Sequence, residues 1–260
     1  MFDKKFKLDP KKRFSSRVEN YIKYRPSYPQ ELVNFLKEKK ILSSNSIIAD
    51  IGSGTGILSE LFLREENIVY GVEPNIDMRT AAEKLLSKYL KFVSVDGSAE
   101  ATNLEPKSID IITAGQAFHW FNLEKARFEF IRILKDKGWV ILIWNRRKKD
   151  TNEFLKEYER LLLKYGTDYK TIEQYKLNFN KFFSGDKSDK NYKIAKFSNY
   201  QIFDYNGLEG RLLSTSYIPL DNHPEYKDML FELKQLFEIH QDDGLIRFEY
   251  DTELIYGQLL

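Results

Sequence analysis

The sequence of 260 residues contains no cysteine and only three histidines. The absence of cysteine excludes disulfides, cysteine-ligated zinc or iron–sulfur centres and a thiolate nucleophile. The three histidines are scattered without the spacing of metal ligands, so we expect no metal site. Long apolar runs are also missing. The longest, residues 139–144, has six residues, whereas a membrane-spanning helix needs about 20.

The N-terminal stretch is basic but lacks the apolar segment of a secretory signal, which favours a cytoplasmic protein. Residues 1–25 hold nine Lys or Arg and three Asp or Glu, a net charge of +6, so the rest of the chain sums to −4 against a total of +2. Such a basic arm either contacts nucleic acid or a phosphate, or is a solvated terminus.

Short apolar runs alternate with amphipathic stretches from about residue 30 to 145, which predicts βαβ units and a parallel sheet. Two later segments complete it, one of them antiparallel. We therefore predict an α/β fold with a doubly wound, mostly parallel seven-stranded sheet. The predicted strands are 46–51, 67–72, 91–95, 108–113, 139–144, 196–203 and 245–256. The predicted helices are one that begins near Ser27 and Pro29, then 55–64, 75–89, 121–134, 148–165 and 223–240.

A glycine-rich turn, Asp50-Ile-Gly52-Ser-Gly54-Thr-Gly56, follows the first predicted strand and opens a helix. Glycines permit a tight turn and the close approach of a ligand, and a helix N-terminus offers free N–H groups. Glu73 ends the second predicted strand, the position at which a carboxylate holds a ribose diol in dinucleotide folds. The alternative is a turn that only packs a helix on a strand.

The loop does not fit the nicotinamide or flavin fingerprint, because Ile57 occupies its sixth position. Asp50 directly precedes the loop. A carboxylate there repels a pyrophosphate and attracts a cationic ligand. S-adenosylmethionine, with its ammonium and sulfonium groups, is such a ligand.

These motifs resemble those of the class I S-adenosylmethionine-dependent methyltransferases, with a Rossmann-like fold. Residues 50–56, 71–75 and 91–100 look like the first, second and third family motifs. The family usually has an aspartate at the position of Ser98, which bonds the adenine amino group. The resemblance implies S-adenosyl-L-homocysteine as product and cofactor contacts from Asp50, Gly52, Ser53, Gly54, Glu73, Pro74, Asn75, Ser98, Ala99, Glu100 and Gln116.

A closer similarity is to the small-molecule branch that includes the trans-aconitate methyltransferases, of methyltransferase type 11-like character. It rests on residues 14–29, 115–121, 214–219 and 251–257. It implies three regions. Residues 1–45 form a basic arm and helix that act as a lid, residues 46–145 the cofactor-binding core, and residues 146–260 the part that completes the sheet and caps the substrate pocket. The polar stretch 166–195 predicts a helical insertion or cap.

The lid hypothesis concerns the stretch around Arg25. Tyr21, Tyr24 and Tyr28 either pack inside a first helix or lie in a lid loop, and the flanking charges and prolines favour the loop. In the lid, Tyr21 and Arg25 contact the cofactor, although the Arg25 fork also suits an acidic substrate.

The substrate side is less defined. His119 is the candidate general base for a hydroxyl acceptor, or a cap of the following helix. The candidates for substrate binding are Tyr24, Tyr28, Trp120, Arg146 and Tyr217. Arg146 opens a charge run that is otherwise a solvated helix start.

The predicted function is methyl transfer to an oxygen nucleophile of a small acceptor, either anionic or neutral, by a monomer or dimer without nucleic acid or membrane partners. The alternatives are an RNA or protein methyltransferase that uses the basic arm, and a non-catalytic cofactor-binding protein. Residues 113–116 lack the Asn/Asp-Pro-Pro-aromatic motif of amino-group methylation, and the absence of cysteine excludes cytosine C5 methylation.

Overall fold

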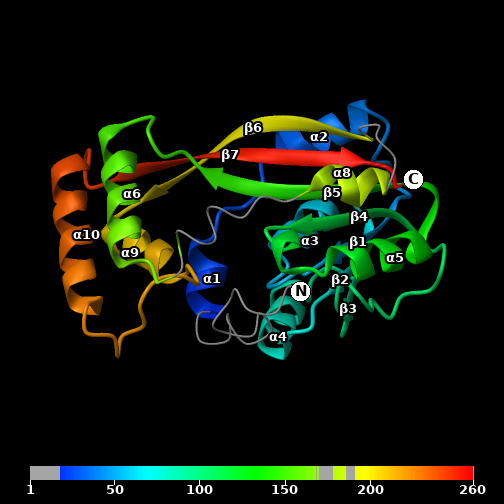
Figure 1. The fold of residues 1–260 in the computed structure, drawn as a ribbon, viewed down its shortest axis with the longest axis horizontal. Helices are drawn as coiled ribbons and strands as arrows, with labels where there is room; N and C mark the ends of the chain where they lie inside the picture. Colours follow the sequence, from blue (N-terminus) through cyan, green and yellow to red (C-terminus); the bar gives the residue numbers. More distant parts are fainter. Residues whose placement is uncertain (1–17, 168, 170–177, 186–190, 260) are drawn as a thin grey trace. The chain divides into compact units, whose positions relative to one another are not determined.

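The computed structural model describes residues 18–167, 169, 178–185 and 191–259. Its strands form a seven-stranded sheet with the order β3-β2-β1-β4-β5-β7-β6 (Figure 1). The strands are β1 (Ile47–Ile51), β2 (Ile68–Val72), β3 (Phe92–Val95), β4 (Ile109–Gly115), β5 (Leu134–Arg147), β6 (Tyr192–Phe203) and β7 (Ile246–Gly257). The first five pair in parallel, and β7 runs opposite to β5 and β6 (Figure 1). The predicted α/β sheet is confirmed.

The helices follow the predicted alternation. They are α1 (Val18–Tyr24), α2 (Gln30–Glu38), α3 (Ile57–Leu63), α4 (Ile76–Leu85), a 3-10 turn (Phe118–Trp120), α5 (Leu123–Ile133), α6 (Glu153–Tyr165), α8 (Phe179–Ser184), α9 (Tyr205–Leu213) and α10 (Tyr226–His240). α6 begins later than predicted because Asn152 caps it, with its side chain accepting a hydrogen bond from the Leu155 N–H.

The described residues group into two compact units. The larger unit takes its residues from Ser27–Asn145, Leu177–Phe197 and Thr252–Leu260. The smaller unit takes them from Met1–Pro26, Arg146–Lys176 and Ser198–Asp251. β5, β6 and β7 each have residues in both units.

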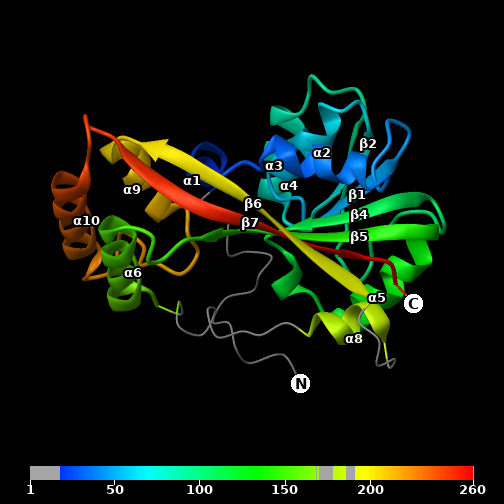
Figure 2. The same cartoon turned by 90° about the horizontal axis from the view of Figure 1, so that it is seen from above.

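The larger unit buries its sheet on both faces. Successive residues of a strand point to opposite faces, so Ile48 and Ala49 enter two different apolar clusters. In Figure 2, α2 and α3 lie on one side of the strands, and α5 and α8 lie on the other. Ile51, Ile112 and Phe130 belong to the cluster on the α5 side. This packing places the carboxyl ends of β1, β2 and β4 at one edge, where doubly wound folds bind ligands.

The smaller unit has its own core, to which α6, α9, α10 and β7 contribute both aliphatic and aromatic side chains. Tyr158 and Phe248 are fully buried, with ring centroids 5.0 Å apart in an edge-to-face arrangement.

The prediction that Tyr21 and Tyr24 lie in a loop is wrong, because both tyrosines lie in α1. The helix gains a tertiary partner that the local sequence does not reveal. A Cβ atom added at Gly210 of α9 would lie 2.0 Å from the Tyr24 ring, so the glycine lets that ring pack directly on the α9 backbone. The helix ends just before Pro26, as the restriction on residues before proline requires.

In the predicted insertion 166–195, the described part contains α8 and the start of β6, while residues 168, 170–177 and 186–190 lie outside the described residues. Across the described chain, no helix is long and apolar enough to span a membrane. No cluster of three or more His, Asp or Glu side chains there could hold a metal ion.

Candidate active site

The glycine-rich turn between β1 and α3 forms one wall of the candidate site. Gly52, Gly54 and Gly56 have φ values of +69°, +57° and +85°, a conformation that favours glycine. A Cβ atom at Gly52 would lie 2.6 Å from the Ala117 Cβ, and one at Gly56 would lie 2.5 Å from the Leu86 Cδ1. At Gly54 an added Cβ meets nothing within 4 Å. Gly54 is thus the point at which the loop leaves room for a ligand.

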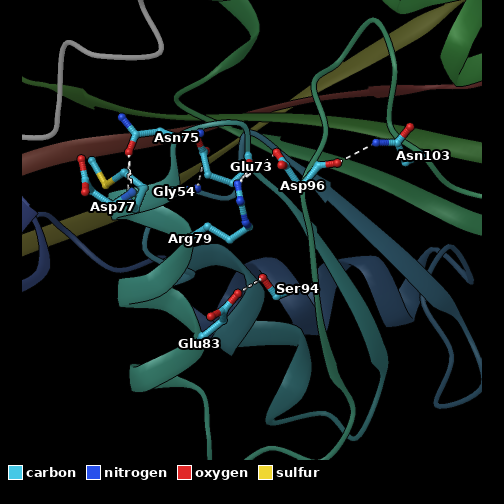
Figure 3. A network of polar contacts seen from close by, with 10 residues as sticks. Gly54, Glu73, Asn75, Asp77, Arg79, Glu83, Ser94, Asp96 and Asn103 are labelled. Atoms are coloured by element: carbon cyan, nitrogen blue, oxygen red, sulfur yellow. Dashed lines mark hydrogen bonds and ion pairs between the residues drawn. The ribbon is translucent and has the colours of Figure 1, made fainter.

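Glu73, directly after β2, points its carboxylate at this open glycine (Figure 3). Its Oε2 accepts a hydrogen bond from the Gly54 N–H and its Oε1 one from the Asn75 N–H, both 2.9 Å long. The residue is 9% exposed. Burial raises the pKa of the Glu73 carboxyl, and the two N–H bonds oppose that rise. The carboxylate is therefore held in one orientation with lone pairs left for a diol.

The next residues anchor that orientation. The Asn75 side chain caps α4 by accepting hydrogen bonds from the Asp77 and Met78 N–H groups. The Arg79 Nη1 donates to the Glu73 carbonyl at 2.7 Å and to Asp96 at 3.1 Å (Figure 3). A cap and a guanidinium thus fix the backbone on both sides of Pro74.

Asp50 lies under the glycine-rich turn and is fully buried. Its two carboxylate oxygens accept hydrogen bonds from the Ser59 Oγ at 2.7 Å and the Thr113 Oγ1 at 3.0 Å. Burial raises the pKa of Asp50 to about 6, against the lowering effect of these hydroxyls. The side chain joins β1, α3 and β4. Its expected contact with a cofactor ammonium stays a prediction.

The third motif forms a tight turn after β3. The backbones of Ser98 and Ala101 bond each other in both directions, at 2.9 and 3.2 Å. The Ser98 Oγ accepts from the Glu100 N–H at 3.3 Å, and the Glu100 Oε1 accepts from the Asn122 N–H at 2.7 Å. Ala99 is buried between them. Ser98, Ala99 and Glu100, the three predicted cofactor contacts of this motif, therefore belong to one ordered turn.

Gln116 follows β4 with φ +58°, which is uncommon for a residue other than glycine. Its N–H donates to the Ile143 carbonyl, and its Nε2 donates to the Asn145 carbonyl at 3.3 Å. A Cβ atom at the neighbouring Gly115 would lie 2.4 Å from the Tyr28 hydroxyl oxygen, so Tyr28 reaches the end of β4 because a glycine stands there.

His119 and Trp120 lie in the 3-10 turn after this end, both half-buried, with ring centroids 4.8 Å apart. The capping alternative for His119 loses support at the start of α5, where Asn122 accepts the Lys125 N–H. The structure thus collects the glycine-rich turn, Glu73, Gln116, His119 and Tyr28 in the larger unit.

The other candidates belong to the smaller unit, where they are Tyr21, Tyr24, Arg25, Arg146 and Tyr217. The Arg25 Nη2 donates to the Ser214 carbonyl at 2.9 Å, and its guanidinium lies 5.0 Å from the Tyr21 ring centroid. Tyr217 packs on Tyr169, with ring centroids 4.8 Å apart, and Arg146 is exposed.

Arg211 is buried in α9 and was not among the sequence candidates. In the sequence, Arg211 could have been recognised as a buried arginine because it lies between Leu208 and Leu212, which face inward on α9.

Comparisons with known proteins bear on the family. The methyltransferase domain family matches residues 49–142, which span the glycine-rich turn, Glu73 and the strands up to β5. An uncharacterised methyltransferase of Geobacillus is 30% identical over 152 residues, or 56% of this chain and 68% of that relative. The chain belongs to the methyltransferase family.

Two further methyltransferase relatives are from yeasts. A methyltransferase-like protein of Schizosaccharomyces pombe is 32% identical over 171 residues, 64% of this chain and 63% of that relative. A probable S-adenosylmethionine-dependent methyltransferase of Saccharomyces cerevisiae is 33% identical over 135 residues, 49% of this chain and 44% of that relative. The chain spans about half to two thirds of the length of the first curated relatives it matches.

Among solved structures, a protein of Anaeromyxobacter dehalogenans assigned as a type II methyltransferase has a TM-score of 0.67. It is 18% identical, and the alignment covers 91% of this chain and 99% of that one. At this identity the likeness shows the methyltransferase fold alone. The similarity to the trans-aconitate branch stays a prediction.

Proposed function

We propose that this chain transfers the methyl group of S-adenosylmethionine to the oxygen of a small-molecule acceptor, a carboxylate or a hydroxyl. One observation carries the proposal. The Glu73 carboxylate is oriented by the Gly54 and Asn75 N–H groups, directly beside a glycine whose missing side chain leaves open space. An oriented carboxylate suits a ribose diol, and the open space at the glycine lets the adjoining part of the ligand approach the backbone closely.

The residues present fit the cofactor in both charge and shape. Gly52, Ser53 and Gly54 are proposed to line its methionine end, with Asp50 on the ammonium side and Gln116 near the methyl group. Glu73 is proposed to hold the ribose hydroxyls. Pro74, Asn75, Ser98, Ala99 and Glu100 are proposed to surround the adenine. Tyr21 is proposed to contact the cofactor, and Arg25 either the cofactor carboxylate or an acidic substrate.

When bound, S-adenosylmethionine supplies an electrophilic methyl carbon with a thioether leaving group. A carboxylate acceptor needs no base. For a hydroxyl acceptor, His119 is proposed to take the proton. The loop, Gln116 and the aromatic residues around His119 contribute by positioning and by excluding water.

The first experiment is calorimetry of the wild-type chain with S-adenosylmethionine, S-adenosylhomocysteine and NAD. We expect binding of the first two and none of NAD. Glu73→Ala should weaken cofactor binding by about 10- to 100-fold, because it removes charge-assisted hydrogen bonds worth about 1.5–3 kcal/mol.

Glu83→Ala is the matched control for Glu73→Ala. Glu83 lies in α4 and only accepts from the Ser94 hydroxyl at the surface (Figure 3), so its loss should leave cofactor affinity unchanged. Equal affinity of wild type and Glu73→Ala would remove Glu73 as the ribose ligand. No binding of any of the three compounds would overturn the proposed function.

Transfer of labelled methyl groups to panels of carboxylic acids, phenols, quinones and RNA then tests the acceptor. Labelling of small acids or phenols supports the proposal. Labelling of RNA alone would favour the alternative that uses the basic arm, most of which, residues 1–17, lies outside the described residues. Cofactor binding without labelling of any panel would favour a non-catalytic protein.

A further inference from the structure

Two arginines meet inside the smaller unit. Arg25 follows α1, and Arg211 lies near the end of α9. Both bind Ser214: the Arg25 Nη2 donates to its carbonyl at 2.9 Å, and the Arg211 Nη1 donates to its hydroxyl at 3.5 Å. Arg211 is only 7% exposed. One residue thus holds two guanidinium groups together in a sheltered place.

The surroundings of this pair are neutral. The Arg211 Nε donates to the Tyr250 hydroxyl at 3.0 Å, and its guanidinium lies over the Phe248 and Tyr250 rings. Arg25 lies over the Tyr21 ring. Within the described part of the chain, neither arginine forms an ion pair with a carboxylate, and the buried acidic residues all belong to the larger unit.

Arg25 also has an unused donor. Its Nε is buried and has no hydrogen-bond partner, although guanidinium donors are normally satisfied when they leave water. Burial and the nearby Arg211 lower the pKa of Arg25. Two neighbouring buried cations without a counterion destabilise the folded state, and an anion between them would offset that destabilisation. Arg25 is half-buried as a residue, so part of it remains open to solvent.

The contrast with Arg147 in the same unit is informative. Arg147 pairs with Glu159 and also donates to the Tyr169 hydroxyl at 3.0 Å. A buried arginine that serves structure alone is thus given a carboxylate of this chain. The arginine pair at Ser214 has donors of the same kind but no carboxylate of this chain beside them. An oxyanion from a ligand would take the place of that carboxylate.

We propose that Arg25 and Arg211 form, within the smaller unit, a binding site for an oxyanion, a carboxylate or a phosphate, of a small-molecule ligand. Guanidinium forks bind such groups in a bidentate manner. An oxyanion between the two arginines would have its lone pairs engaged by their N–H donors, including the Arg25 Nε that has no partner within the described chain.

The same chemistry has another source, the carboxylate of the cofactor's methionine, which Arg25 was also expected to reach. The experiment separates the two. Thermal unfolding and calorimetry of the full chain are measured with succinate, citrate and inorganic phosphate at constant ionic strength, with and without S-adenosylhomocysteine. The variants are Arg25→Met, Arg211→Met and, as a control, Arg247→Met, an exposed arginine beside Glu249.

We expect at least one oxyanion to raise the wild-type melting temperature and to bind at least tenfold more weakly to Arg25→Met and Arg211→Met, but not to Arg247→Met. The affinity for S-adenosylmethionine should change less than threefold in Arg211→Met and Arg247→Met. If carboxylates bind and phosphate does not, or the reverse, the chemical class of the bound oxyanion follows directly.

Two results would overturn the proposal. One is the absence of any oxyanion effect on the wild type, with or without S-adenosylhomocysteine, which needs no variant to fold. The other is a tenfold or larger loss of S-adenosylmethionine affinity in Arg211→Met, which would assign the pair to the cofactor. Failure of the wild type to bind S-adenosylmethionine would instead overturn the proposed function, and a separate titration measures it.

Discussion

The two units bury charges of opposite sign in different ways. In the larger unit, each oxygen of Asp50 and Glu73 receives a hydrogen bond from a neutral hydroxyl or backbone N–H. In the smaller unit, Arg25 and Arg211 contact a carbonyl, hydroxyls and rings, and the Arg25 Nε has no partner.

A carboxylate can be stabilised by neutral donors that its own chain brings close, because every neighbouring backbone carries an N–H. A pair of guanidinium groups offers more donors than the surrounding aromatic residues can accept. The comparison indicates that the oxygens of Asp50 and Glu73 have their hydrogen bonds before any ligand binds. The arginine pair lacks an acceptor, which in our proposal an anionic ligand supplies. The following predictions test each side of this comparison.

The largest effect is expected for Gly54→Ala. The matched control is Gly244→Ala, because Gly244 also has a positive φ, +74°, and nothing within 4 Å of an added Cβ. Both changes should cost about 1–2 kcal/mol of stability through the left-handed backbone. Only Gly54→Ala should weaken S-adenosylmethionine binding, by about 100-fold or 2.7 kcal/mol. Calorimetry and urea unfolding check both values, and equal affinities would show that no ligand lies at Gly54.

Asp50→Asn tests whether the buried carboxylate of Asp50, once ionised, destabilises the folded state. The folded pKa of Asp50, about 6, lies above its ordinary value of 3.8. The folded state therefore holds more protons than the unfolded state between these values, and wild-type stability falls as pH rises from about 4 to 6. The asparagine variant should lack this fall and be more stable at pH 7 by about 3 kcal/mol. A wild-type minus variant difference that does not vary from pH 4 to 7 would contradict the assignment.

Arg147→Met and Arg211→Met compare a paired with an unpaired buried arginine. Arg147→Met leaves Glu159 with Lys149, 3.2 Å away, as its remaining cation, so we expect a loss of about 1–2 kcal/mol. Arg211→Met removes an uncompensated charge and should leave the free energy of unfolding unchanged or higher in the absence of anions. Urea unfolding in a buffer without oxyanions measures both, and a larger loss for Arg211→Met would reverse the comparison.

The smallest effect is expected for Ser98→Asp. In the resembled family an aspartate at this position bonds the adenine amino group, and Ser98 accepts only a long hydrogen bond from the Glu100 N–H. The aspartate should strengthen S-adenosylmethionine binding by about three- to tenfold, because a charged acceptor forms the stronger hydrogen bond. Weaker binding in calorimetry would place the adenine elsewhere.

Much of the larger unit was predictable because its signals are local. The alternating apolar runs gave β1 to β4 to within two residues, and the glycine-rich turn was readable together with Glu73. β5 was predicted as residues 139–144 but extends from Leu134 to Arg147. Its ends are charged, and pairing with neighbouring strands, which single-strand periodicity does not contain, holds them extended.

The smaller unit was harder to predict because its contacts join distant segments. α1 owes its place to the packing of Tyr24 on Gly210, and α9 itself was not predicted. Arg211 meets Tyr250 across 39 residues, and Arg25 meets Ser214 across 189. No motif of a few residues encodes such a cluster. Only the identity of an arginine at an inward helix position hints at it.

The strand order has a consequence for how the chain acquires its structure. β7 is the last strand along the chain, yet it lies between β5 and β6. During synthesis β5 and β6 therefore emerge with their facing edges unpaired, and they can be joined only when β7 inserts between them. Because this step closes contacts between segments far apart in sequence, it is expected to be the slow phase of refolding and the interval in which aggregation competes.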